Sequence, residues 1–274
     1  MHRDRVAKNA QAGRSRGSYT RGVTIRVDVL AVSVPGLRAM RWSTDALHTG
    51  MKEVYAIARV ETGRAVWQGR GKLWSAGPGS VQLHQPGDVH RDVSRDGPIT
   101  FQIVTFPART VERAIGRVRV HPQLAASDER GAAFQRLHDA VQAGADRLAL
   151  EVAVAEAISA LASSGDPGCD HTRPVRRAIE LLRTRLAESV MLDDLAAHAG
   201  LDKFRLCRAF RAEVGMPPYA YLTRLRIMRA KQLLADGVKP GDVARQVGLY
   251  DQSQLNRHFR RLVGTTPGPY ARGV

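Results

Sequence analysis

The segment GLYDQSQLNRHFRRLVGTTPGPY, residues 248–270, carries side chains suited to hydrogen bonding with the edges of nucleic-acid bases. Leu255, Phe259 and Leu262 recur at the spacing of one buried helical face. The opposite face is polar and consists of Asp251, Gln252, Ser253, Asn256, Arg257 and Arg260. Asn and Ser are poorer helix formers than the Glu and Lys of an ordinary solvated face. Since Gln, Asn, Ser and Arg bind base edges and Arg also holds phosphates, the pattern favours contact with DNA over simple solvation.

The element that carries this face occurs twice in the chain. Residues 193–221 align with residues 241–270, and both copies contain Ala-x-x-x-Gly, at Ala196–Gly200 and at Ala244–Gly248. The small Ala lets a second helix cross closely, and Gly supplies the positive φ of a sharp turn between helices. Two helix-turn-helix patterns at matched positions indicate two recognition helices. In the first copy the corresponding face carries Lys203, Phe204, Arg205, Cys207, Arg208 and Arg211.

The charge of the chain is concentrated where these units lie. The 274 residues carry a net charge of +16. Residues 173–274 hold 19 Lys and Arg against 9 Asp and Glu, residues 1–22 hold 6 against 1, and residues 23–172 hold 17 against 16. A neutral middle and a basic C-terminal third are expected if one domain meets a polyanion and another does not.

The order of predicted elements divides the chain into five parts. Residues 1–22 are polar and basic without a period, which predicts a disordered segment. Short β-prone runs separated by Gly-rich turns predict a small barrel over 23–108. Helical patterns over 109–119 and 129–163, broken near Gly144, predict a connector spanning 109–163. A polar linker over 164–173 then precedes an all-helical region, 174–274.

Residues 174–274 resemble the DNA-binding domain of AraC-type transcription regulators. The resemblance rests on the two Ala-x-x-x-Gly turns, the bridging helix PPYAYLTRLRIMRAKQLLAD and the ending DQSQLNRHFRRLVGTTPGPY. It implies two helix-turn-helix units that enter adjacent major grooves on one face of DNA. The positions that contact DNA in the family fall here on Phe204, Cys207, Arg208, Gln252, Ser253, Asn256 and Arg257. Met191 departs from the family pattern, since a capping Ser or Thr is common there, so the first short helix relies on Asp193 and Asp194.

The N-terminal part resembles the cupin-like effector-sensing domain of the same family, through VYAIARVETG, AGPGSVQL and QPGDVH. The candidate effector-binding residues are His48, Tyr55, Trp67, His84 and His90. Cupins include metal-dependent enzymes, which resemble one another in a His-x-His pair, a Glu and a distant His. Here Gly50 occupies the place of the second His, which leaves a poor transition-metal site. We therefore expect neither a metal, nor another cofactor, nor catalysis.

Together these patterns predict an α+β protein: a cupin-like β-barrel, then helices, then an all-α C-terminal domain with two helix-turn-helix units. We expect a cytoplasmic regulator that binds double-stranded promoter DNA and a small-molecule effector. Two cysteines give no disulfide framework, and no apolar run approaches the ~20 residues that span a bilayer. The resemblance implies a homodimer, with RNA polymerase as a possible further partner. A metal-dependent cupin enzyme and a non-specific architectural DNA-binding protein stay open as alternatives.

Overall fold

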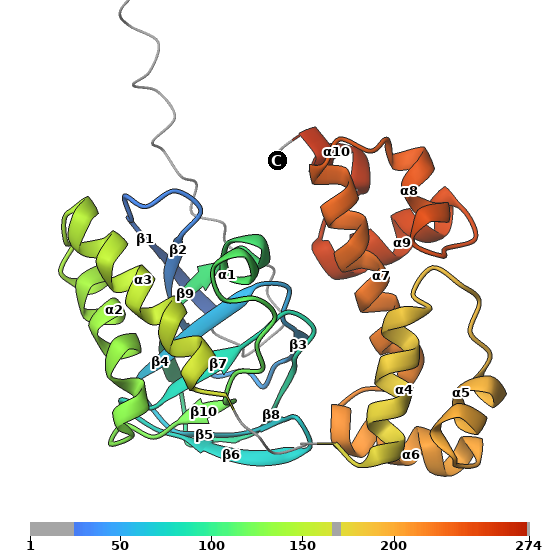
Figure 1. Ribbon diagram of the computed structural model, residues 1–274, viewed down its shortest axis with the longest axis horizontal. Coiled ribbons are helices and arrows are strands. Elements are labelled where there is room, and N and C mark those ends of the chain that lie inside the picture. The colour runs from blue at the N-terminus through green and yellow to red at the C-terminus, as the bar shows by residue number, and fades with distance from the viewer. Residues whose placement is uncertain (1–24, 166–170, 273–274) are drawn as a thin grey trace, which may run out of the picture.

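The computed structural model describes residues 25–165 and 171–272, which form a β-barrel with attached helices beside a helical region (Figure 1). The disordered segment predicted over 1–22 lies outside the described residues, as does half of the predicted linker. The α+β class is confirmed, with strands in the N-terminal half and helices in the C-terminal part.

Two antiparallel sheets form the barrel. The six-stranded sheet has the order β1 (Ile25–Leu30), β2 (Arg38–Thr44), β9 (Ile99–Phe106), β4 (Tyr55–Thr62), β7 (Val81–His84) and β10 (Gln123–Leu124). The four-stranded sheet has the order β3 (Thr49–Met51), β8 (Val89–Arg95), β5 (Ala65–Gly69) and β6 (Lys72–Ala76). Side chains of successive strand residues point to opposite faces, so the larger sheet contributes to two cores. The inner core contains Ala58, Val60, Trp67 and Phe101.

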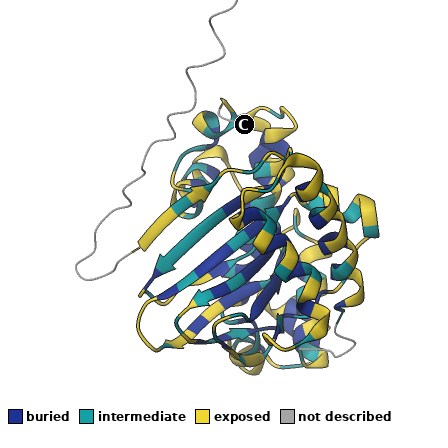
Figure 2. Cartoon of the chain, turned by 90° about the vertical axis from the view of Figure 1, so that its left-hand side faces the viewer, coloured by how far each residue is buried: buried dark blue, intermediate teal, exposed yellow. Residues whose placement is uncertain are grey.

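Helices cover the outer face of the six-stranded sheet. They are α1 (Ala108–Ile115), α2 (Ala132–Gln142) and α3 (Arg147–Ser163), with a short 3-10 turn η1 (Glu129–Gly131) before α2. Their apolar residues, among them Phe134 and Leu137, join Ile57 and Val104 in a core whose central side chains are fully buried (Figure 2). The predicted break near Gly144 is confirmed, because this residue has φ of +61° between α2 and α3. The helix expected over 109–119 is shorter, because Gly116 with φ of +72° ends α1.

The helical region consists of α4 to α10. Their bounds are α4 (Arg173–Thr184), α5 (Leu192–Ala199), α6 (Lys203–Val214), α7 (Pro218–Ala235), α8 (Pro240–Gln246), α9 (Gln252–Val263) and α10 (Pro267–Arg272). Two apolar clusters hold it together: one centres on Phe210 and Tyr221, the other on Leu255 and Phe259. α7 contributes to both clusters and joins the two halves (Figure 1).

Candidate nucleic-acid interface

Each predicted helix-turn-helix forms around a glycine turn. α5 and α6 are separated by Gly200, and α8 and α9 by Gly248, each with φ of +75°. Left-handed backbone of this kind is costly for any other residue. A Cβ on Gly248 would also lie 2.5 Å from the carbonyl oxygen of Ala187, whereas the space around Gly200 is open. The second turn therefore requires glycine for both conformation and packing.

The longer helix of each unit begins at an aspartate cap. The Asp202 carboxylate accepts the backbone N–H groups of Phe204 and Arg205, at 3.0 and 2.9 Å. Asp251 accepts the N–H of Gln254 at 2.7 Å. α5 has Met191 at its N-cap without a side-chain hydrogen bond, and Asp193 and Asp194 in its first turn, as the sequence indicated. Since its carboxylate caps α9, Asp251 has a structural role in addition to the DNA contact predicted for it.

The two longer helices present matching exposed faces. A helix turns by about 100° per residue, so Phe204, Cys207, Arg208 and Arg211 share one side of α6, opposite buried Leu206. An offset of 49 residues takes this set to α9, where the side opposite buried Leu255 carries Ser253, Asn256, Arg257 and Arg260. Lys203, Arg205 and Gln252 lie at the margins of these faces. The structure thus brings the predicted contact residues of each unit together on one surface.

Four arginines on these faces have no partner among the described residues. Arg208, Arg211, Arg257 and Arg260 form no ion pair or side-chain hydrogen bond there, whereas Lys203 lies 3.4 Å from Asp193 and Arg205 lies 3.9 Å from Asp202. Burial lowers the pKa of His258, on the inner side of α9, and nearby Arg261 and Arg257 lower it further. Matched, unneutralised guanidinium groups suit phosphates and base edges.

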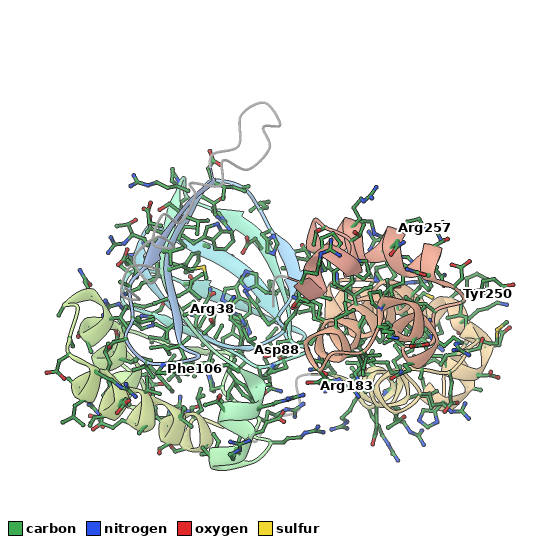
Figure 3. The ribbon with its side chains drawn as sticks, turned by 90° about the horizontal axis from the view of Figure 1, so that it is seen from above. Arg38, Asp88, Phe106, Arg183, Tyr250 and Arg257 are labelled. Carbon is green, nitrogen blue, oxygen red and sulfur yellow. The ribbon has the colours of Figure 1, made fainter. Side chains whose placement is uncertain are left out.

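Two side chains of this surface were missed by the sequence analysis. Tyr250, just before α9, is 91% exposed and points away from the barrel (Figure 3). Arg261 lines a shallow hollow on α9 together with Asn256, Arg257 and Arg260. The sequence does contain a signal for Tyr250, because an aromatic residue in a short turn is exposed to water. An exposed aromatic ring indicates a contact surface.

The predicted effector residues are only partly brought together. Trp67 is buried between two imidazoles, with its ring centroid 4.8 Å from that of His90 and 5.5 Å from that of His84. His90 Nε2 lies 2.7 Å from Asp92 Oδ1. Burial lowers the pKa of His84 and of His90, which favours the neutral form of both imidazoles. The three rings pack against one another inside the barrel.

The other two predicted effector residues differ in their relation to this cluster. His48 is exposed and in an edge contact with Trp42, and its backbone N–H donates to Asp92 Oδ2 at 2.8 Å, so it adjoins the carboxylate that binds His90. Tyr55 belongs to the core between the six-stranded sheet and the helices, on the face of β4 opposite the inner core. The prediction that grouped Tyr55 with the imidazoles is therefore corrected. A Cβ on Gly50 would lie 2.5 Å from His48 Nε2, so a side chain at this position would require the imidazole of His48 to move. Within residues 25–165 and 171–272 no group of three His, Cys, Asp or Glu is placed to hold a metal ion.

Comparisons with known proteins agree with this arrangement. The family described as an AraC-like ligand binding domain matches residues 38–158, and a helix-turn-helix domain family matches residues 195–273. The uncharacterized HTH-type transcriptional regulator YbfI of Bacillus subtilis is 27% identical over 221 residues, which cover 74% of this chain and 79% of that protein. A putative AraC-like transcription regulator of Streptomyces lividans is 35% identical over 125 residues, covering 45% of this chain and 39% of that protein. Among solved structures, the DNA-binding domain of AdpA in complex with a target DNA is 27% identical, with a TM-score of 0.36 over 37% of this chain and 93% of that one.

A ligand-binding barrel joined to two helix-turn-helix units defines a transcription regulator with a sensor and a DNA-binding domain. The chain belongs to the AraC type of these regulators. In the described residues, no helix combines the length and the apolar character needed to cross a membrane.

Proposed function

We propose that the chain binds a specific promoter sequence in double-stranded DNA by placing α6 and α9 in successive major grooves. The observation that carries this proposal is the matched pair of exposed faces, on which Arg208 and Arg211 repeat as Arg257 and Arg260. α7, with 18 residues and a length of about 27 Å, joins the two units. That length is compatible with two readers about 34 Å apart, one turn of DNA.

Three side chains of α9 are suited to base edges. Ser253, Asn256 and Arg257 lie in its first two turns, where a recognition helix is closest to the groove floor. Asn pairs with adenine and Arg with guanine through two hydrogen bonds each. In α6, Arg208 takes the equivalent place, while Phe204, 72% exposed, and half-buried Cys207 offer apolar contact to a thymine methyl group.

Binding to the promoter upstream of the gene, compared with random DNA of equal length, tests this function. We expect a preference of about 10³-fold or more for the promoter, in the range of specific regulators, and a footprint of two patches. Equal affinity for both DNAs would instead identify a non-specific architectural protein. The fragment 174–274 should retain binding, with affinity that falls steeply as salt rises.

We further propose that the barrel domain binds a small-molecule effector and that the chain acts in the cytoplasm as a homodimer without catalytic activity. RNA polymerase is then a candidate partner at the promoter. An exposed apolar stripe on α3 supports the dimer: Leu148 is 71% and Val152 51% exposed, one helical turn apart. Pairing of this stripe with its copy would remove both side chains from water.

A further inference from the structure

The turn that follows α4, residues 185–188, lies between the two helix-turn-helix units. Leu186 in this turn packs against both apolar clusters of the helical region. The backbone of the next residue, Ala187, lies against the glycine turn of the second unit, since a Cβ on Gly248 would come within 2.5 Å of the Ala187 carbonyl oxygen. In Figure 1, α4 ends beside α9, where this turn begins. The turn is therefore in contact with both units.

A buried arginine of the bridging helix α7 holds this turn. Arg226 Nε donates to the Leu186 carbonyl oxygen at 2.9 Å, and Arg226 Nη2 donates to the Glu188 carbonyl oxygen at 2.6 Å. The turn also closes on itself, because the backbone N–H of Glu188 donates to the Arg185 carbonyl oxygen at 3.0 Å. A planar guanidinium with its donors in a fixed fork can hold two carbonyl groups at once. Arg226 therefore fixes the turn relative to α7 at two points.

The same side of α7 contacts the second reading helix. Tyr219 stands seven residues before Arg226, which places both on one side of α7. The ring centroid of Tyr219 lies 6.5 Å from that of His258, on the inner side of α9. Burial lowers the pKa of His258, and nearby positive charges, that of Arg226 among them, lower it further. One side of α7 is thus shared by the 185–188 turn and by α9.

The relative position of α6 and α9 determines whether both helices can enter DNA grooves at the same time. α4 packs in the same apolar cluster as α6, so the turn that ends α4 is tied to the first reading helix. One base pair adds about 3.4 Å along the DNA axis and turns the duplex by about 35°. A change of that size between α6 and α9 would move one of them out of its groove.

We propose that Arg226 and the 185–188 turn form a clamp that fixes the distance and angle between α6 and α9, so that the chain selects the spacing of two half-elements in its promoter. Arg226 is a positioning residue, since it is buried away from the reading faces and acts through the turn and through Gly248. It provides specificity for spacing, whereas the side chains on α6 and α9 provide specificity for bases. The proposal deepens the two-groove binding proposed above and rests on it.

Promoter fragments of altered spacing test the proposal with the full chain. One base pair is added or removed between the two footprinted patches, and affinity is measured for these fragments, for the native promoter and for fragments with a single half-element. The wild type should bind each altered fragment at least about tenfold more weakly than the native promoter, because one reading helix loses its groove. Equal binding at all spacings would overturn the clamp. A preference for the promoter over random DNA would still support the function proposed above.

Arg226→Lys and Arg226→Gln test the arginine. The single ammonium group of lysine keeps the charge but cannot hold both carbonyl groups in the geometry of a guanidinium, and glutamine removes the charge as well. Both variants should reduce the spacing preference to about threefold or less, with affinity for single half-elements within about twofold of the wild type. The control Arg229→Gln removes a charge from the exposed side of α7, where Arg229 donates to Gln232 at 3.2 Å, and should keep the full preference.

Leu186→Ala tests the same clamp from the other side, because it removes the side chain that packs against both clusters. It should also relax the spacing preference. Each variant is assayed at a temperature at which thermal melting shows it to be folded. A folded variant of Arg226 or Leu186 that keeps the full spacing preference would refute the clamp, as would an equal loss in Arg229→Gln. Equal weakening on native, altered and single-element fragments would refute it too, because the substitution would then act on binding in general.

Discussion

Arg257 and Arg260 lie on the same face of α9, and changing each to alanine should impair DNA binding in a different way. Arg257 lies in the second turn of the helix and Arg260 a turn further from its start. Neither has a hydrogen-bond or ion-pair partner among the described residues, and both are exposed, so alanine removes no such interaction within the protein. Alanine is also a better helix former than arginine. We therefore expect both variants to fold and melt like the wild type, which isolates the effect on DNA.

The expected magnitudes follow from the two kinds of contact. A bidentate Arg–guanine contact discriminates between bases by about 1–3 kcal/mol, or roughly 5- to 150-fold. Arg257→Ala should therefore lose affinity for the promoter and lose preference at one base position, with little change on random DNA beyond the loss of one charge. Arg260→Ala removes a phosphate contact. The plot of the logarithm of the association constant against the logarithm of the salt concentration should therefore become less steep by about 0.9. A fourfold rise in salt should then weaken this variant by about 3.5-fold less than the wild type.

Binding of both variants to the promoter, to its single-base substitutions and to random DNA, across a salt series, measures these differences. Arg113→Ala is the matched control, because it removes an equal charge from exposed α1 in the barrel domain. The control should bind like the wild type on every DNA. Uniform weakening on all sequences by Arg257→Ala would refute base reading by this residue.

Three further outcomes are expected from the structure. Gly248→Ala should destabilise the chain by about 2–5 kcal/mol, because alanine disfavours the left-handed backbone and its Cβ would overlap Ala187. Gly200→Ala should cost only about 1–2 kcal/mol, because only the backbone conformation is disfavoured there. Equal losses of stability for the two variants in chemical denaturation would contradict the packing argument. Burial lowers the pKa of His138 to about 3, whereas a histidine in the unfolded chain has a pKa of about 6.5. Between these two pH values the unfolded chain binds a proton that the folded chain does not. The free energy of unfolding should therefore fall by about 1.4 kcal/mol for each pH unit as the pH decreases from 6.5 toward 3, with no such contribution above 6.5. His138→Leu should flatten that slope, and an unchanged slope would show that this imidazole is not buried neutral. The double variant Leu148→Glu/Val152→Glu on α3 should convert a dimer to a monomer in light scattering. The control Arg147→Glu/Glu151→Arg, which changes residues beside the apolar stripe, should remain a dimer. If Leu148→Glu/Val152→Glu also remains a dimer, the interface lies elsewhere.

The helical half was predictable because its signals are local. The Ala-x-x-x-Gly spacing and the apolar period lie within single segments, and they led to α5, α6, α8 and α9. In the barrel, the face of each residue depends on strand pairing. Tyr55 and His84 both lie on buried strands, yet the pairing of Ala56 with His84 puts Tyr55 on the opposite face of the sheet. The two-residue strand β10, which pairs with β7, carries no local signal of its own.

The cleft of about 440 Å³ that the barrel domain forms with α4 was beyond the reach of sequence patterns. Arg119 and Arg183 are 64 residues apart, and their approach depends on how the barrel meets α4. Arg70 has φ of +51°, uncommon for a residue other than glycine, and its guanidinium is anchored to Asp88 and Val120.

Hydroxyl-radical footprinting of the full chain on its own promoter tests the central claim most directly. If α6 and α9 occupy successive major grooves, protection will appear as two patches on one face of the DNA, centred about 34 Å apart, for each copy bound. Changing Arg208 to alanine should weaken one patch and changing Arg257 the other. A single continuous patch that both substitutions weaken alike would contradict the account.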